Sequence, residues 1–203
     1  MAWRAASTPV GPSSAASQGG DASSSSGDAA GSTSGCRSSS VGASTGSGGG
    51  DAGCKRGLAS NDTPGPAFEG GVAWWYNWAI QGAGVPPGIE FVPMIWDERT
   101  AGDGPPAGAS FLLGFNEPNF HAQADLTPQE AAALWPDLEA SAPGIPLVSP
   151  AMNFCGPEDQ CNGTNPYQYL RDFFAACTDC RVDYVAVHWY NCDLPSLRDY
   201  LEP

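Results

Sequence analysis

The sequence predicts an α/β fold built around a parallel sheet. Short apolar runs rich in aromatic and β-branched residues recur from Lys55 onward, and several are continuous rather than alternating in polarity. Such continuous runs are typical of strands that are covered on both faces. Over the second half of the chain the order is strand, helix, strand, helix, strand, which favours parallel strands joined by right-handed crossovers.

The first 53 residues differ from the rest of the chain. Of these residues, 37 are Ala, Ser or Gly, whereas every Phe and Tyr lies further along. So little apolar surface cannot offset the conformational entropy that is lost on folding. We therefore expect residues 1–53 to be a disordered tail or linker and residues 54–203 to form the folded domain.

Six strands are expected from the apolar runs and from the Gly, Pro, Asn or Asp residues that follow them. They cover residues 56–59, 72–78, 90–96, 110–115, 146–150 and 182–189. The early connections, at 60–71, 79–89 and 97–109, are too short and too rich in Gly and Pro for full helices. We expect loops or single turns there.

Two later connections carry helix signals. In the first, Thr127 supplies an N-cap, Pro128 a first helical residue and Glu130 a capping-box partner, and the segment runs to Ala140 before a Pro-Gly stop. The second places apolar residues on one face at helical spacing: Tyr167, Leu170, Phe173, Phe174 and Cys177.

The charge balance excludes several classes of partner. The formal net charge is −14, and Lys55 is the only lysine. Because so few cations are available to neutralise phosphates, we expect no nucleic-acid partner and no membrane-surface binding. No apolar run approaches the roughly eighteen residues of a membrane span, and no signal peptide is visible at the start of the chain.

The seven cysteines favour an oxidising compartment but do not by themselves establish one. Cys155 with Cys161, and Cys177 with Cys180, are close enough in sequence to form disulfides. A zinc site built from the same four residues is the alternative, but the spacing of the first pair is too wide for a usual zinc ribbon or finger. The odd total implies a free cysteine or a missing partner.

The sharpest local motif is Asn116-Glu117-Pro118, which follows the strand expected at 110–115. A glutamate at the carboxyl end of a parallel strand can project into a cleft, while the neighbouring amide binds a substrate hydroxyl. Other expected strands also end in Trp, Tyr and Asn, which suit a neutral polysaccharide. A single aromatic residue would more often fill a core, but a cluster at several strand ends indicates a binding cleft.

Six ordered blocks of the sequence resemble glycoside hydrolase family 128, whose members are also described as alkali-sensitive-linkage-like glycosyl hydrolases. The resemblance covers residues 54–203 and rests on Lys55-Arg56-Gly57-Leu58-Ala59, Trp75-Tyr76-Asn77-Trp78, Phe91-Val92-Pro93-Met94-Ile95-Trp96, Leu113-Gly114-Phe115-Asn116-Glu117-Pro118-Asn119, Leu147-Val148-Ser149-Pro150-Ala151 and Val185-Ala186-Val187-His188-Trp189-Tyr190. It implies an α/β fold of the (β/α)8 TIM-barrel type and retaining, endo-acting β-1,3-glucanase chemistry without a cofactor or metal. It also implies a β-1,3-glucan polysaccharide or oligosaccharide as partner, and an extracellular or cell-wall location.

The resemblance assigns roles to individual residues. Glu117 is implied as the general acid/base, and Asn116 as the residue that orients a substrate hydroxyl or the carboxylate. We expect glucosyl units to be contacted by Trp75, Tyr76, Asn77, Trp78, Trp96, Asn153, His188, Trp189 and Tyr190. A hydrogen-bonding core role is the commoner alternative for His188, and His121 is expected to face solvent.

The second carboxylate of the family has no equivalent in this sequence. Retaining hydrolysis needs a nucleophile about 5 Å from the acid, and the family supplies it at the end of the seventh strand. None of Glu90, Asp97, Glu98, Asp183 and Glu202 is in a position to replace it. We therefore expect an incomplete barrel of about six strands with two unpaired edges, which is a fragment of a longer enzyme and inactive by itself.

Two other functions are compatible with parts of the sequence. A non-catalytic β-glucan-binding protein would use the same aromatic cleft without chemistry. A cysteine-rich metal module would bind zinc through Cys155, Cys161, Cys177 and Cys180. The hydrolase hypothesis is favoured because it accounts for all six blocks in their order.

Overall fold

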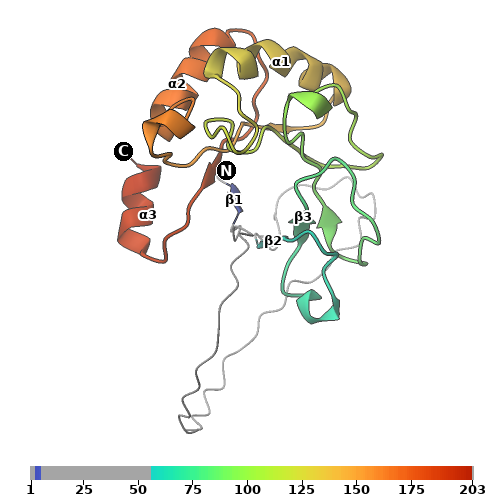
Figure 1. Ribbon diagram of the computed structural model, residues 1–203. Helices are drawn as coiled ribbons and strands as arrows, with labels where there is room; N and C mark the ends of the chain where they lie inside the picture. The colour runs from blue at the N-terminus through green and yellow to red at the C-terminus, as the bar shows by residue number, and fades with distance from the viewer. Residues whose placement is uncertain (1–2, 6–55, 203) are drawn as a thin grey trace, which may run out of the picture.

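Parallel strands form the centre of the molecule, as the sequence predicts (Figure 1). The computed structural model describes residues 3–5 and 56–202. The strands are β1 (Trp3–Ala5), β2 (Gly57–Ala59), β3 (Trp74–Tyr76), β4 (Glu90–Phe91), β5 (Leu112–Leu113), β6 (Leu147–Val148) and β7 (Ala186–His188). Strands β2 to β7 fall within the six expected ranges and are shorter than those ranges.

The strands pair in parallel and largely in chain order. One sheet runs β2-β3-β4 and another β5-β6, and an isolated parallel bridge between Met94 and Leu113 joins them. A second parallel bridge, between Val148 and Tyr184, links β6 to the segment that enters β7. This order brings the carboxyl ends of β3, β5 and β7 to the same side of the molecule, where residues that follow them can meet.

Strand β1 is a feature that the sequence does not predict. Residues Trp3–Ala5 pair in parallel with Ala186–His188. This edge of β7 was expected to be unpaired, and the structure shows that it is paired. An open strand edge presents free N–H and C=O groups that an extended segment can satisfy, whatever its composition. The rest of the expected tail, including Cys36, lies outside the described residues.

Helices α1 (Pro128–Ser141), α2 (Pro166–Ala176) and α3 (Leu194–Leu201) complete the fold. The expected capping box is confirmed: the Glu130 N–H donates to Thr127 Oγ1 over 3.2 Å, and the Thr127 N–H donates to Glu130 Oε2 over 2.8 Å. The early connections contain only the short 3-10 helices η1 (Pro66–Phe68) and η2 (Glu98–Thr100), as expected. A third, η3 (Glu158–Gln160), follows β6.

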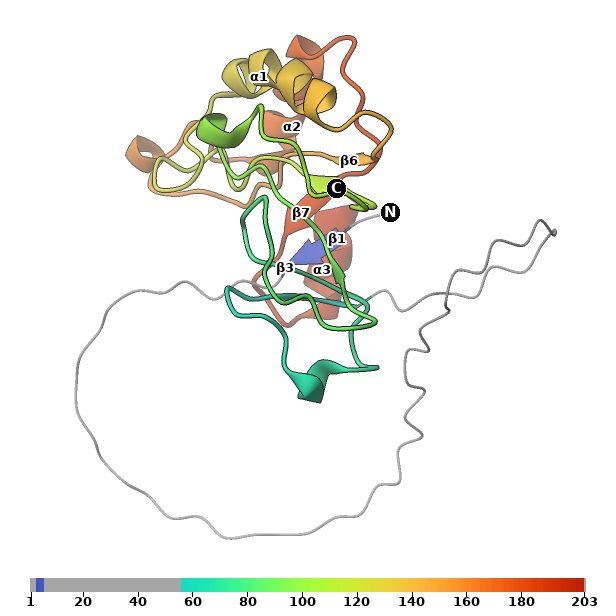
Figure 2. The ribbon, with the colours of Figure 1, turned by 90° about the vertical axis from the view of Figure 1, so that its right-hand side faces the viewer.

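The largest core cluster lies between the strands and helices α1 and α2, which lie side by side in both views (Figures 1 and 2). Trp135 of α1 is its centre. The Trp135 ring contacts Phe115 at 6.0 Å and Phe173 at 5.3 Å between centroids, and its indole N–H donates to the Arg181 carbonyl over 3.0 Å. This packing fixes α1 and α2 over the strand that leads to Glu117.

Both expected disulfides are present, Cys155–Cys161 and Cys177–Cys180. The zinc module is therefore wrong, because these four sulfurs are bonded in pairs and are not thiolate ligands. Cys192 is free and exposed, whereas Cys54 lies outside the described residues. Within residues 56–202, no helix is long and apolar enough to cross a bilayer.

Candidate active site

Glu117 lies four residues beyond the end of β5, on the loop that follows the strand. Its N–H donates to the Ala151 carbonyl over 2.8 Å, and the neighbouring Asn116 forms a parallel bridge with Ala151. The backbone φ angle of Glu117 is 41°, in the left-handed region that residues with a Cβ rarely adopt. Such strain persists where the surrounding structure holds it and is concentrated at functional sites.

Two residues at the end of β7 bind the Glu117 carboxylate. His188 is the last residue of the strand, and Tyr190 lies two positions beyond it. His188 Nδ1 lies 2.7 Å from Glu117 Oε1, and the Tyr190 hydroxyl donates to the same oxygen over 2.8 Å. The His188 ring is buried and Glu117 is only 9% exposed, whereas Tyr190 is 47% exposed. Glu117 is 71 positions from His188 and 73 from Tyr190 in sequence, yet the three side chains form one polar cluster at the carboxyl ends of β5 and β7.

The environment of Glu117 acts on its pKa in opposite directions. Burial raises the pKa, while hydrogen bonds from His188 and Tyr190 and the Coulomb interaction with His188 lower it. The lowering effects win, so the pKa of Glu117 is below its usual value. The carboxylate is therefore ionised at neutral pH, and it can accept hydrogen bonds or a proton.

Asn116 is held beside Glu117 by a residue that the sequence does not single out. Its Nδ2 donates to Gln123 Oε1 over 3.0 Å, and its backbone carbonyl accepts from the Ala124 N–H. Among the described residues, the buried Oδ1 of Asn116 has no hydrogen-bond partner. Gln123 could have been found only from the turn that folds residues 117–124 back onto Asn116, and that turn has no distinctive sequence pattern.

Tyr76, Trp78 and Trp96 belong to the group of aromatic residues that the sequence assigns to the cleft. The Tyr76 hydroxyl is buried and has no hydrogen-bond partner among the described residues. Burial raises the pKa of Tyr76, and the nearby charges of Tyr190 and Glu117 raise it further, which places this hydroxyl close to both. Trp78 packs on Tyr76 at 5.1 Å between centroids, and the Trp96 carbonyl accepts from the Asn116 N–H.

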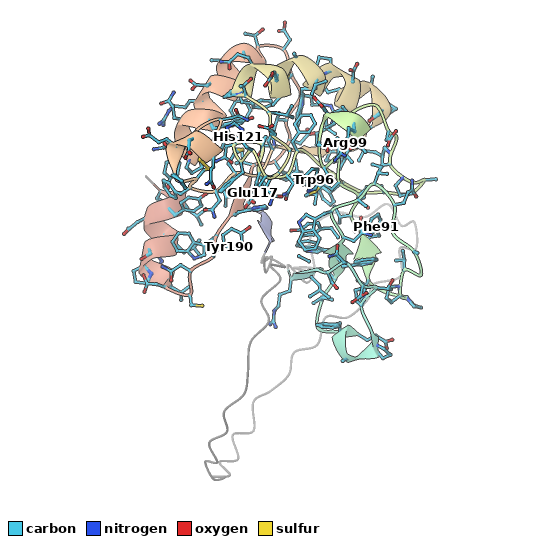
Figure 3. All side chains as sticks on the ribbon, in the orientation of Figure 1. Phe91, Trp96, Arg99, Glu117, His121 and Tyr190 are labelled. Atoms are coloured by element: carbon cyan, nitrogen blue, oxygen red, sulfur yellow. A yellow bond between two sulfur atoms is a disulfide. The ribbon has the colours of Figure 1, made fainter. Side chains whose placement is uncertain are left out.

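Glu117 lies between Trp96 and Tyr190 near the middle of the molecule, whereas Phe91 and Arg99 lie further to the right (Figure 3). A small cavity opens between the inner faces of the strands. It is lined by Tyr76, Leu113, Ser149, Ala186 and His188, among others. Tyr76 and His188 therefore border the same space from opposite strands.

Trp75 is a correction, because the structure does not bring it to this site. Successive residues of a strand point to opposite faces, and Trp75 points away from Tyr76. It is 1% exposed and packs against Phe91 at 5.1 Å in a separate core cluster with Ile89.

Three other predicted contacts have structural partners of their own. Asn77 closes a turn, with Nδ2 donating to the Gln81 carbonyl over 3.0 Å. The Asn153 carbonyl accepts from Asn119 Nδ2 over 2.8 Å, and the Trp189 ring contacts Tyr200 at 5.2 Å.

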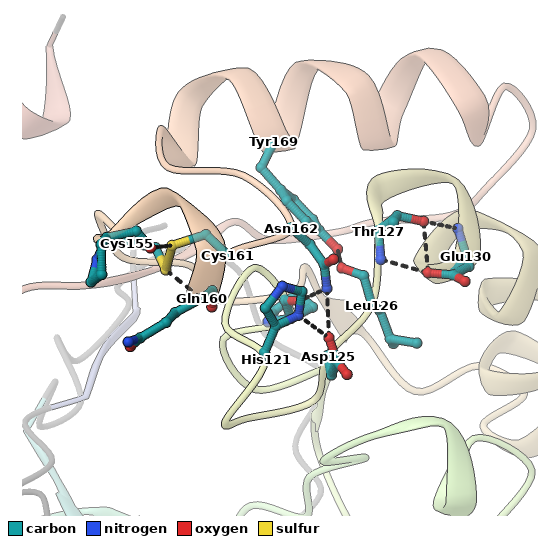
Figure 4. A network of polar contacts seen from close by, with 12 residues as sticks. His121, Asp125, Leu126, Thr127, Glu130, Cys155, Gln160, Cys161, Asn162 and Tyr169 are labelled. Carbon is teal, nitrogen blue, oxygen red and sulfur yellow. Dashed lines mark hydrogen bonds and ion pairs between the residues drawn. A yellow bond between two sulfur atoms is a disulfide. The ribbon is translucent and has the colours of Figure 1, made fainter.

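His121 is exposed, as the sequence predicts, and belongs to a polar network next to the site (Figure 4). His121 Nδ1 lies 2.6 Å from Asp125 Oδ1, which also accepts from Asn162 Nδ2 over 2.9 Å. The backbone of Asn162 donates to the Asn119 carbonyl. The network ties the loop after Glu117 to the loop closed by the Cys155–Cys161 disulfide.

Three of the other carboxylates considered in the sequence, Glu90, Asp97 and Asp183, have separate partners. Glu90 is the first residue of β4, at the opposite end of the strands from Glu117, and its Oε1 accepts a hydrogen bond from the Ser110 N–H. Asp183 Oδ2 accepts from the Leu147 N–H and from Arg181, again where strands begin. Asp97 caps η2 and pairs with Arg99.

Known proteins with similar sequences and structures are glycosyl hydrolases or their relatives. Residues 57–203 match the family model described as glycosyl hydrolase catalytic core. Alkali-sensitive linkage protein 1 of Schizosaccharomyces pombe is 32% identical over 139 residues, a match that covers 64% of this chain and 24% of that protein. The chain therefore spans about a quarter of the length of this curated relative.

Solved structures give the same result. A family 128, subgroup II endo-β-1,3-glucanase from Sorangium cellulosum is 44% identical, with a TM-score of 0.60, over 73% of this chain and 68% of that one. A subgroup I endo-β-1,3-glucanase from Amycolatopsis mediterranei, in complex with laminaritriose, is 34% identical, with a TM-score of 0.51, over 65% of this chain and 56% of that one.

Proposed function

Because the chain belongs to the glycosyl hydrolase catalytic core family, and within it to glycoside hydrolase family 128, we propose that it carries the acid/base part of a retaining endo-β-1,3-glucanase. The substrate class is β-1,3-glucan, and the complete fold is a (β/α)8 barrel. The observation that carries this proposal is the cluster of Glu117, His188 and Tyr190 at the carboxyl ends of parallel strands. In α/β barrels this is the side on which catalytic residues gather.

In this proposal Glu117 transfers a proton twice. These transfers need the complete barrel, in which a nucleophile carboxylate nearby would raise the pKa of Glu117 and keep it protonated. Glu117 would then give its proton to the glycosidic oxygen as the nucleophile displaces that oxygen from the sugar C1, and would later take a proton from the water that attacks the glycosyl-enzyme intermediate. His188 and Tyr190 hold the carboxylate oxygen in position through both steps. The Oδ1 of Asn116 is an acceptor without a partner among the described residues, and we propose that it binds a sugar hydroxyl.

The cleft aromatic residues are proposed to bind the glucosyl units. Trp78, Trp96 and Tyr190 are at least partly exposed and offer ring faces or a hydroxyl group near Glu117, which suits the CH-rich faces and hydroxyl rims of glucose. Tyr76 is only 1% exposed and lines the cavity instead. The acidic net charge of the chain is compatible with a neutral ligand. An extracellular or cell-wall location is proposed as well, supported by the two disulfides.

We further propose that residues 54–203 lack the nucleophile, so that this chain alone does not complete double displacement. A second carboxylate about 5 Å from Glu117 would disfavour ionisation of one member of the pair and raise its pKa. The pKa of Glu117 is instead lowered by His188 and Tyr190, against the effect of burial. Glu90, Asp97 and Asp183 each have partners elsewhere.

Hydrolysis of laminarin, followed by the release of reducing ends, tests the missing nucleophile. We expect no turnover by the 203-residue chain. Turnover that Glu117→Gln abolishes would contradict this expectation and would mean that a second carboxylate within the chain completes the reaction.

A second candidate function is glucan binding without chemistry, which the partly exposed rings of Trp78, Trp96 and Tyr190 favour. It predicts an affinity for laminarin that survives Glu117→Gln and falls when Trp78 or Trp96 is replaced by Ala. Isothermal titration calorimetry measures both. Loss of binding with the glutamate substitution alone would count against this function.

A further inference from the structure

Phe154 is an exposed aromatic residue on the same side of the molecule as Glu117. It follows β6 by six positions and is 52% exposed. Single exposed apolar side chains are ordinary on protein surfaces, so exposure alone assigns it no role. Its backbone and its neighbours set it apart from an ordinary loop residue.

The backbone at Phe154 is fixed on both sides. The preceding residue, Asn153, accepts a hydrogen bond from Asn119 Nδ2 at its carbonyl and one from the Phe154 N–H at Oδ1, each over 2.8 Å. The following residue, Cys155, is bonded to Cys161. Since the position of the ring is already set, a ligand that packs on it pays little for ordering the loop.

Two tyrosines support the ring from beneath. Phe154 contacts Tyr167 at the start of α2 and Tyr200 near the end of α3, in both cases at 5.8 Å between centroids. The Tyr167 hydroxyl donates to the Tyr200 carbonyl over 2.8 Å, which locks the two tyrosines together. The aromatic support leaves about half of the Phe154 surface open to solvent.

The same aromatic cluster extends to Trp189, which is next to a ligand of the Glu117 carboxylate in the sequence. Tyr200 contacts the Trp189 ring at 5.2 Å between centroids. Trp189 precedes Tyr190, whose hydroxyl donates to Glu117. On the other side, Asn119 belongs to the loop of Glu117 and binds Asn153 next to Phe154. The loop of Phe154 is thus tied to the loop of Glu117, and its aromatic neighbours reach the residue before Tyr190.

We propose that Phe154 is the platform of an additional glucosyl subsite, which binds a sugar unit of the same β-glucan chain that occupies the Glu117 site. This inference rests on the proposed function. A glucosyl ring presents a flat, CH-bearing face that packs on an aromatic ring, and a neutral sugar suits the acidic chain. The subsite adds affinity only for oligosaccharides long enough to reach from Glu117 to Phe154.

Calorimetric titration of the full chain with laminaritriose, laminaripentaose and laminarihexaose tests the subsite. Some of these ligands should bind the wild type more tightly than shorter ones because they reach Phe154. For the longest of them, we expect Phe154→Ala to weaken binding about five- to tenfold, which is the effect of one aromatic contact. Binding of ligands too short to reach Phe154 should be unchanged. Phe154→Tyr keeps an aromatic face and should retain the gain.

Phe174→Ala is the matched control. Phe174 is 41% exposed, packs against Phe173, and lies near the end of α2 that is distant from Tyr167. It should leave the affinity for every ligand unchanged, which separates a local subsite from a general loss of exposed apolar surface.

Three results would overturn the subsite. Equal affinity of wild type and Phe154→Ala for laminarihexaose would remove it while leaving the proposed function intact. Equal weakening at every length by both Phe154→Ala and Phe154→Tyr would mean a structural role for the residue. Absence of binding of any oligosaccharide to the wild-type chain would contradict the proposed function, and the subsite with it.

Discussion

The segment 110–202 and the segment 56–109 are built differently (Figure 1). In segment 110–202, helices α1 and α2 cover β5 and β6 through the largest core cluster, and both disulfides lie in this segment. In segment 56–109, loops cover the outer side of β2 to β4 around three buried residues, Trp75, Ile89 and Phe91. On the inner side, Trp74, Tyr76, Val92 and Met94 join a cluster that is shared with segment 110–202.

The difference separates two tasks. Glu117, His188 and Tyr190 all come from segment 110–202, where packing and cross-links hold their loops in place. Tyr76, Trp78 and Trp96 come from segment 56–109. We infer that the well-packed segment fixes the geometry of the Glu117 cluster, while the other segment mainly supplies aromatic side chains to the proposed sugar site.

The largest expected difference between the segments is in the energetic contribution of their buried tryptophans. Trp135→Ala should lower the free energy of unfolding by about 3–5 kcal/mol, since a large buried ring and its hydrogen bond are lost. Trp75→Ala should cost about 1 kcal/mol less, because its indole N–H has no partner among the described residues. Urea unfolding followed by circular dichroism measures both.

Matched substitutions to Phe make the same comparison without a large cavity. Trp135→Phe leaves the Arg181 carbonyl without its donor and should destabilise the chain. Trp75→Phe removes a buried N–H that has no acceptor and should be close to neutral. A greater loss for Trp75→Phe would contradict the proposed difference between the segments.

The two disulfides should differ in what they do for the site. Replacing either pair by Ser should cost about 2 kcal/mol of stability, because each cross-link restricts the unfolded chain. Only the Cys155/Cys161 replacement should also weaken laminarihexaose binding, since its loop contacts the Glu117 loop through Asn119 and Asn162. Equal effects of the Cys177/Cys180 replacement on binding would argue against this role.

Gln123 offers a smaller and more local test. Gln123→Leu leaves the buried Nδ2 of Asn116 without an acceptor, so we expect a loss of about 1–2 kcal/mol of stability and weaker oligosaccharide binding. Gln123→Glu keeps an oxygen acceptor at the same position and should bind as the wild type does. If Leu and Glu behave alike in calorimetry, the hydrogen bond does not position Asn116.

The smallest expected effect is on the pH dependence of stability. The folded-state pKa of Glu117 is lowered from 4.5, so its contribution to stability is fully present above that pH and is lost as the pH falls through the folded value. The difference in stability between wild type and Glu117→Gln should therefore shrink in acid. A difference that stays constant from neutral pH to pH 3 would mean that His188 and Tyr190 do not stabilise the ionised form.

Local signals predicted much of this fold. The Thr127–Glu130 capping box is confirmed because both partners lie within one helical turn. The close cysteine pairs and the apolar runs of β2 to β7 are local for the same reason. Trp75 was misassigned since a strand alternates its faces, and the sequence alone did not reveal which face of β3 turns inward.

Long-range contacts were harder to predict. Tyr190 and His188 reach Glu117 from more than 70 residues away, so their shared hydrogen bonds depend on the order of the strands. Gln123 acts through a turn that has no sequence signature, and β1 pairs with β7 although its segment is rich in Ala, Ser and Gly. The resemblance to a family supplied candidate residues, but only the packing brought them together.

A crystal structure of the chain soaked with laminaritriose tests the central claim most directly. We predict a glucosyl unit with an oxygen within hydrogen-bonding distance of the Glu117 carboxylate and a ring against Trp78, Trp96 or Tyr190. An oligosaccharide bound only at a surface remote from Glu117 would contradict the claim that this carboxylate serves a glucan-binding cleft.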